Sequence, residues 1–168
     1  MQVVDEAVGE WGRATAVFSP DRRHRYLLTR TWDDTLPSVN FVMLNPSTAD
    51  AFALDPTNRR CVGFAQSWGF GAMVTTNVFA FRSTDPKGLR AVVDPVGPGN
   101  DDAIVEAATS CDLVVAAWGV HASIGGRGDA VRALLAEHGV ALDVLRLTKD
   151  GHPGHPLYVP GSTRPTPW

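Results

Sequence analysis

The sequence has few cysteines, no long apolar run and no excess of positive charge, and each absence excludes a class of protein. The two cysteines, Cys61 and Cys111, are far apart and form no C-x-x-C pair, which argues against a disulfide framework or a four-thiolate cluster. No apolar run reaches the roughly 20 residues that span a bilayer. The first residues also lack the basic start and apolar stretch of a signal peptide. We therefore expect a cytoplasmic protein with no membrane partner.

The formal net charge of -3 gives the chain no general attraction to nucleic acid. Arginines nevertheless cluster within residues 21–30 and at residues 59–60. Such a cluster is more often a solvated face, but it can also contact phosphates. The candidate phosphate ligands are Arg22, Arg23, Arg59 and Arg60.

Apolar segments and turn residues indicate the order of strands and helices. The first 32 residues predict a β-hairpin around the turn at 20–24. Further apolar runs show little polar alternation, which is typical of strands buried on both faces. They span residues 39–44, 72–81, 112–119 and 140–147. Helices are predicted between them, at 55–69, 99–110 and 128–139.

This alternation of strand and helix predicts an α/β fold, a three-layer α/β/α sandwich with a mainly parallel central sheet of about four strands. The N-terminal hairpin would extend one edge of the sheet. A chain of 168 residues with 44% hydrophobic content suits one core, so we predict a single domain. Its parts would be the hairpin extension (1–32), the α/β core (33–150) and a Pro/Gly-rich loop and tail (151–168).

Polar residues follow several of the predicted strands. Because parallel strands end at one edge of a sheet, Asn45, Asn77 and His155 are expected to lie near one crevice. Trp118 and His121 follow the third of these strands. Each of the first three also has an ordinary interpretation: Asn45 as a turn former, Asn77 as a buried hydrogen-bonded amide and His155 as a loop histidine.

A metal is a rival explanation for the histidines. His152 and His155 are three residues apart, and His121 follows another strand. No adjacent cysteine or acidic residue completes a zinc signature. We therefore expect neither a metal nor another cofactor.

Five motifs resemble those of one family and together cover nearly the whole chain. They read MLNPSTADAFALDPTNRRC, TNVFAFRSTDP, DPVGPGNDD, AAWGVHA and TKDGHPGHPLYV. Through them the chain is identified as a member of the domain-of-unknown-function 1643 family of bacterial and phage proteins. The family name states no activity.

A second, more distant resemblance is to the uracil-DNA glycosylases, which carry similar motifs at strand ends in the same order. MLNPS resembles the G-I-N-P-G loop of the mismatch-specific branch, with Met43 and Ser47 in place of its glycines, and TTNVFAFRS resembles the strand with the base-reading asparagine. VVAAWGVHA and HPLYV resemble the next strand and the H-P-S loop. The resemblance implies an α/β/α fold and hydrolysis of an N-glycosidic bond at a modified or damaged base in DNA or in a nucleotide.

The same resemblance implies a role for each matched residue. Asn77 would read the base, Asn45 would hold the attacking water, and His155 would donate to the departing base. Asp50 is a candidate carboxylate, because an asparagine at position 45 cannot act as a general base. The remaining candidates for substrate binding are Pro46, Ser47, Phe52 as the stacking aromatic, Trp118 and His121.

Two other interpretations stay open. A non-catalytic module could bind nucleic acid or a nucleotide on the same fold, using the four arginines for phosphates. Alternatively, the tail at 151–168 could dock a protein partner. For the hydrolase and for the non-catalytic module, the expected partner is DNA or a nucleotide.

Overall fold

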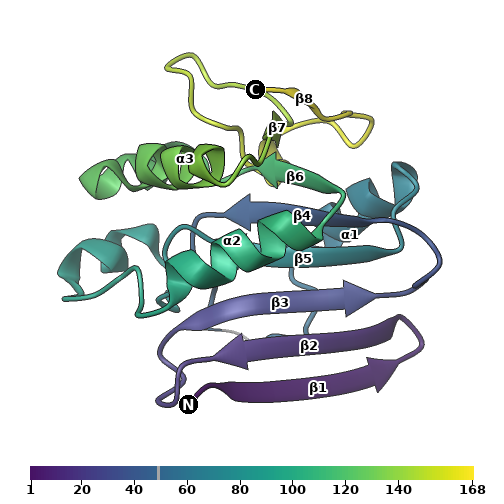
Figure 1. The fold of residues 1–168 in the computed structure, drawn as a ribbon, viewed down its shortest axis with the longest axis horizontal. Helices are drawn as coiled ribbons and strands as arrows, with labels where there is room; N and C mark the ends of the chain where they lie inside the picture. Colours follow the sequence, from purple (N-terminus) through teal and green to yellow (C-terminus); the bar gives the residue numbers. More distant parts are fainter. Residues whose placement is uncertain (49) are drawn as a thin grey trace.

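The computed structural model describes residues 1–48 and 50–168, which form one twisted sheet with helices against it (Figure 1). Neighbouring strands follow the order β1-β2-β3-β5-β4-β6-β7-β8. The strands are β1 (Val3–Gly9), β2 (Gly12–Phe18), β3 (Arg25–Thr31), β4 (Ser38–Met43), β5 (Ala72–Asn77), β6 (Leu113–Ala116), β7 (Asp143–Val144) and β8 (Thr166–Pro167).

The predicted fold class, a mainly parallel sheet of about four strands in a three-layer sandwich like that of the uracil-DNA glycosylases, was wrong. Within the described residues the sheet has eight strands. Four of its seven pairings are antiparallel: β1–β2, β2–β3, β3–β5 and β7–β8. The predicted N-terminal hairpin is confirmed as β2 and β3. Strand β1 was not predicted, because it alternates between half-buried and exposed residues instead of forming an apolar run. It makes the hairpin a three-stranded meander, whose last strand pairs with β5.

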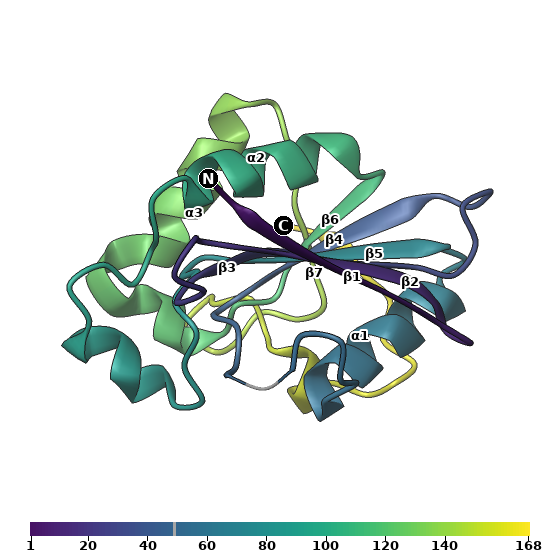
Figure 2. The ribbon, with the colours of Figure 1, turned by 90° about the horizontal axis from the view of Figure 1, so that it is seen from below.

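The helices lie close to the ranges expected from the sequence. They are α1 (Pro56–Ser67), α2 (Asn100–Ser110) and α3 (Arg127–Glu137), with short 3-10 helices η1 (Pro86–Ala91), η2 (Val120–Gly126) and η3 (Pro156–Tyr158). Helices α2 and α3 lie on one face of the sheet and α1 on the other (Figure 2). None of the helices that the structure describes combines the length and the apolar character needed to cross a bilayer.

Strand β4 separates two cores. Phe41 and Met43 pack with Phe64 of α1 on one face, whereas Val42 packs with Ile104 of α2 on the other. Each of these buried side chains contributes about 1.5–3 kcal/mol relative to an exposed one. A shift of one residue would exchange the two faces, so the burial fixes the register of β4 and the position of the loop that follows it.

A β-bulge interrupts the pairing of β2 with β3. Phe18 pairs with Arg25 and Val17 with Leu27, so that Tyr26 is an extra residue on β3. The extra residue reverses the alternation of side chains, and Arg25 lies on the face opposite to Leu27, which packs toward α2. Because β3 runs antiparallel to β5, the start of β3 lies beside the carboxyl end of β5, and the Arg25 N–H donates to the carbonyl of Ala80 at 2.9 Å.

Candidate functional site

A cavity of about 490 Å³ lies at the carboxyl ends of β4 and β5, in the size range of small-molecule sites. The loop after β4, the first turn of α1 and the segments after β6 and β7 form its other walls. Seven of the residues singled out from the sequence line it: Asn45, Pro46, Ser47, Asn77, Trp118, His121 and His155. The residues predicted at the strand ends therefore line one cavity, although the sheet around it differs from the prediction.

The side chain of Asn45 is held by the backbone of two loops. Its Nδ2 donates to the carbonyl of Pro46 at 3.0 Å and to that of Ser83 at 2.9 Å. These bonds fix the amide plane, and its Oδ1 accepts no hydrogen bond from another described residue. Asn45 thus has a structural role in joining the loops, and it retains an oriented acceptor at the cavity wall.

Asn77 ends β5, is 3% exposed and lines the cavity. Its carbonyl oxygen accepts from Asn100 Nδ2 at 2.9 Å, which fixes the backbone at the strand end. Its side-chain amide makes no hydrogen bond to another residue that the structure describes. Because Asn77 lines the cavity, both the donor and the acceptor of this amide are available to a ligand.

His155 precedes the short helix η3 and caps its first turn. Its Nδ1 accepts from the Leu157 N–H at 3.2 Å, which assigns the proton of the neutral ring to Nε2. Burial lowers the pKa of His155 below its ordinary value, because the interior disfavours the charged ring. His155 is therefore a neutral imidazole whose Nε2–H is available as a donor.

Asp55 and Tyr158 also line the cavity, although the sequence analysis did not assign them to the site. Asp55 was expected only to begin a helix, and its Oδ1 does accept from the Asn58 N–H at 2.7 Å, yet the carboxylate also lines the cavity. Tyr158 is 74% exposed, and its ring lies 5.5 Å from that of His155. Neither had a distinguishing signal in the sequence, because helix caps and loop tyrosines are common.

Two predicted residues lie away from the cavity. Phe52 packs against the small core that contains Phe18 and Leu28 and does not line the cavity. Asp50, the candidate carboxylate, accepts from the Phe52 N–H at 2.8 Å and shapes a turn. The loop after β4 therefore supplies no stacking ring at position 52.

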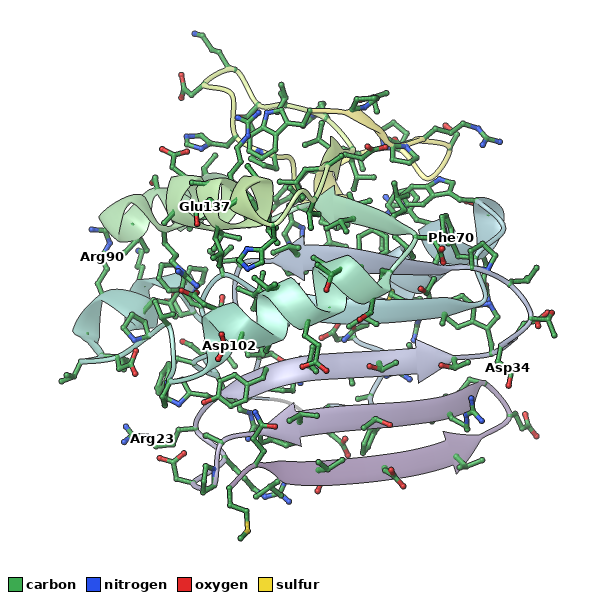
Figure 3. The ribbon with its side chains drawn as sticks, viewed as in Figure 1. Arg23, Asp34, Phe70, Arg90, Asp102 and Glu137 are labelled. Atoms are coloured by element: carbon green, nitrogen blue, oxygen red, sulfur yellow. The ribbon has the colours of Figure 1, made fainter. Side chains whose placement is uncertain are left out.

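The four arginines predicted to bind phosphate also lie outside the cavity lining. Arg22 forms two hydrogen bonds to the carboxylate of Asp5, at 2.7 and 2.8 Å. Arg59 and Arg60 donate to backbone carbonyls at 3.4 and 3.0 Å. Arg23, near the turn between β2 and β3, projects away from the sheet (Figure 3).

A different arginine enters the cavity. Arg25 is only 5% exposed and lines the wall beside Thr75 of β5. Its guanidinium makes no hydrogen bond or salt bridge to another described residue, and both its Nε and the Thr75 Oγ1 are buried without a partner. Burial, together with the nearby Arg82, lowers the pKa of Arg25 to about 10, so the side chain stays charged at neutral pH.

The remaining reactive groups show no arrangement for metal binding. In the described part of the chain, no three side chains of His, Cys, Asp or Glu form a group that could hold a metal ion. Cys61 is buried, and burial raises the pKa of its thiol. It packs in the core against α1 as a small apolar side chain.

Residues 25–157 match the sequence profile of one family, described as a protein of unknown function (DUF1643). The chain belongs to this family. The match contains every residue of the cavity lining except Tyr158. Comparisons with curated proteins and with solved structures found no significant match.

Proposed function

We propose that the cavity hydrolyses an N-glycosidic bond, releasing a modified or damaged base from a nucleotide or from DNA. One observation carries the proposal: a carboxylate (Asp55), a neutral imidazole donor (His155) and an unengaged amide (Asn77) line the same cavity. Cleavage of such a bond needs a base for water, a donor for the departing base and a group that reads its edge.

Each step of the proposed reaction has a group in the cavity. Asp55 accepts a proton from water while the water oxygen bonds to the sugar carbon and the carbon–nitrogen bond breaks. Asn45 Oδ1 accepts the second hydrogen of the water and so orients it. The electron pair of the broken bond leaves with the base, and the His155 Nε2–H donates a hydrogen bond to the negative charge that develops there. The released base anion takes a proton from solvent, and Asp55 returns its proton to solvent.

Recognition of the base would come from side chains that have no other partner. Asn77 can donate and accept at once, which suits the edge of a nucleobase. The exposed ring of Tyr158 is available for stacking on a base, a contact worth about 1–3 kcal/mol in nucleic-acid binders. It takes the place of Phe52, which packs in the core.

The local motifs also support the proposal. The MLNPS loop, TTNVFAFRS and HPLYV resemble glycosylase motifs in sequence order, and Asn45, Asn77 and His155 of these motifs line one cavity. The proposal does not use a glycosylase fold, which the mixed sheet contradicts. It uses only the groups at this edge of the sheet.

Base release tests the proposal directly. Wild-type protein would be incubated with oligonucleotides and with mononucleotides that carry uracil, hypoxanthine or xanthine, and free base would be measured by chromatography. We expect release from at least one substrate and a large loss in Asp55→Asn and His155→Gln. No release from any substrate by folded wild-type protein would reject the hydrolase.

A non-catalytic nucleotide-binding module is the second candidate. The unpartnered guanidinium of Arg25 favours it, because an anion would stabilise this buried charge whether or not a bond is cleaved. Binding of a nucleotide that is recovered intact after long incubation would support this alternative.

A further inference from the structure

We propose that Arg25 binds a terminal phosphate monoester in the cavity, so that the substrate class is the free mononucleotide rather than a base within a nucleic-acid strand. This inference rests on the proposed function, because it names the substrate of the same cavity. Its central observation is a buried cation that lacks a protein partner.

An arginine as deeply buried as Arg25 usually has an acidic side chain as its partner. The side chain is 5% exposed, and no carboxylate among the described residues forms a salt bridge with it. Arginine is almost never fully buried unless it is paired, and an uncompensated charge in the interior is strongly destabilising. Since Arg25 lines the cavity, an anionic ligand there would supply the missing partner.

The surroundings of Arg25 favour an anion with several oxygens. The nearby charged groups that act on it are two arginines, Arg82 and Arg30, and one carboxylate, Asp55. Thr75 Oγ1 lines the same wall and is also buried without a partner. A phosphate can accept from the guanidinium and from the hydroxyl at once, and the fork of an arginine suits phosphate geometry.

A second arginine lies at a more exposed part of the cavity lining. Arg146 follows β7, is exposed and makes no side-chain hydrogen bond to another described residue. With Arg25 it gives the cavity two cations from opposite halves of the sheet. A dianionic monoester is better matched to two cations than a singly charged phosphodiester.

The arginines that the sequence analysis assigned to phosphates offer little support for binding of a nucleic-acid strand. A strand is bound through a row of free cations along its backbone. Here Arg22 is paired with Asp5, and Arg60 is held by the carbonyl of Val159. Inside the cavity, Arg25 and Arg146 place two cations where a chain end fits and a continuous backbone would need to leave in two directions.

Calorimetric binding to the intact protein tests this inference. The probes are inorganic phosphate, a set of deoxynucleoside monophosphates with uracil, hypoxanthine, xanthine or adenine, the corresponding nucleosides, and a short oligonucleotide without terminal phosphates. We expect at least one nucleotide to bind roughly tenfold or more tightly than its nucleoside, and inorganic phosphate to compete with it. Arg25→Gln should lose most of the preference for the nucleotide over the nucleoside.

Arg30→Gln is the matched control. Arg30 lies on the same strand, is 2% exposed and also has buried nitrogens without a partner, but it does not line the cavity. This variant should keep the preference for the nucleotide. If Arg25→Gln does not fold, Arg25→Lys, which retains the charge, and Arg146→Gln, which changes an exposed residue, should each weaken the preference partly.

Three results would overturn the inference: equal binding of nucleotide and nucleoside by the wild type, an undiminished preference for the nucleotide in Arg25→Gln, or tighter and steeply salt-dependent binding of the oligonucleotide. The hydrolase is judged separately by base release. Arg25-dependent nucleotide binding without release would reject the hydrolase and keep this inference. Release of base from oligonucleotides alone would support the hydrolase and reject this inference.

Discussion

The parallel and antiparallel parts of the sheet supply the cavity in different ways. The parallel strands β4 and β5 present Asn45 and Asn77 where they end or just beyond. Antiparallel β3 presents Arg25 at its first residue, which lies beside the end of β5 because the two strands run in opposite directions. The mixed topology therefore brings neutral amides and a buried cation to one edge, which an all-parallel sheet would not do in this way.

The largest expected effect concerns the proposed general base and the donor to the departing base. Asp55→Asn should lower the rate of base release by about 10²–10⁴-fold, the range typical of a general base. His155→Gln should lower it by about 10²–10³-fold, the range for a lost donor to a developing anion. The measurement is single-turnover release from the best substrate. His138→Gln is the control, because His138 is exposed at the end of α3 and bonds only the carbonyl of Leu134; a similar loss there would point to a general defect.

The next prediction concerns how much the core under the parallel strands and the antiparallel edge strand β1 each contribute to stability. Phe64→Ala should lower the free energy of unfolding by about 3–5 kcal/mol, because Phe64 is 1% exposed and its ring stacks 5.3 Å from that of Trp68. Val8→Ala in β1 should change it by less than about 0.5 kcal/mol, since Val8 is 82% exposed. Urea unfolding of both variants is the test, and equal losses would contradict the comparison.

A smaller effect, of opposite sign, is expected at Arg25. Arg25→Met should raise the free energy of unfolding of the ligand-free protein by about 1–4 kcal/mol, since replacing buried charge with apolar volume often stabilises. Arg30→Met should gain less, because Arg30 Nη2 donates to the carbonyl of Phe52 at 2.8 Å. Urea unfolding would measure both, and destabilisation by Arg25→Met would assign Arg25 to the scaffold.

The smallest effect is a pH dependence at His155. Its pKa is lowered in the folded protein by burial, so between that value and the ordinary value near 6.5 the unfolded chain binds more protons. The contribution of His155 to stability is therefore complete above about pH 6.5 and decreases as the pH falls toward the folded pKa. Unfolding measured across this window should show the decrease in wild type and less of it in His155→Gln; identical curves would contradict the assignment.

Much of the central region was predictable because its signals are local. Buried parallel strands form apolar runs, and Asp55 and Pro56 mark the start of α1. The strand-end rule then placed Asn45, Asn77 and His155 near each other without knowledge of the pairing. The β2–β3 hairpin was also predicted, from its turn. The pairings of β1 with β2 and of β3 with β5 were missed, because β1 has no apolar run and the direction in which β3 meets β5 is decided by distant residues.

The sequence analysis did not assign Arg25 to the cavity, for a related reason. Alternation along β3 assigns Arg25 to the face of Leu27, and only the bulge against β2 moves it to the other face. Arg22 and Arg23 stood in the same basic run, and nothing in their sequence distinguishes a paired surface arginine from a buried one. Paired surface arginines and buried arginines differ in side-chain burial and in hydrogen-bond partners, and residue type alone does not show these.

The bulge also gives β2 a role beyond its own position. The family match begins at Arg25, so β1 and β2 lie outside it, yet the pairing with β2 determines the face on which Arg25 lies. A deletion of one residue that removed the bulge would restore the ordinary alternation and turn the arginine toward α2. The N-terminal strands therefore control which charge the cavity presents, although none of their own side chains lines it.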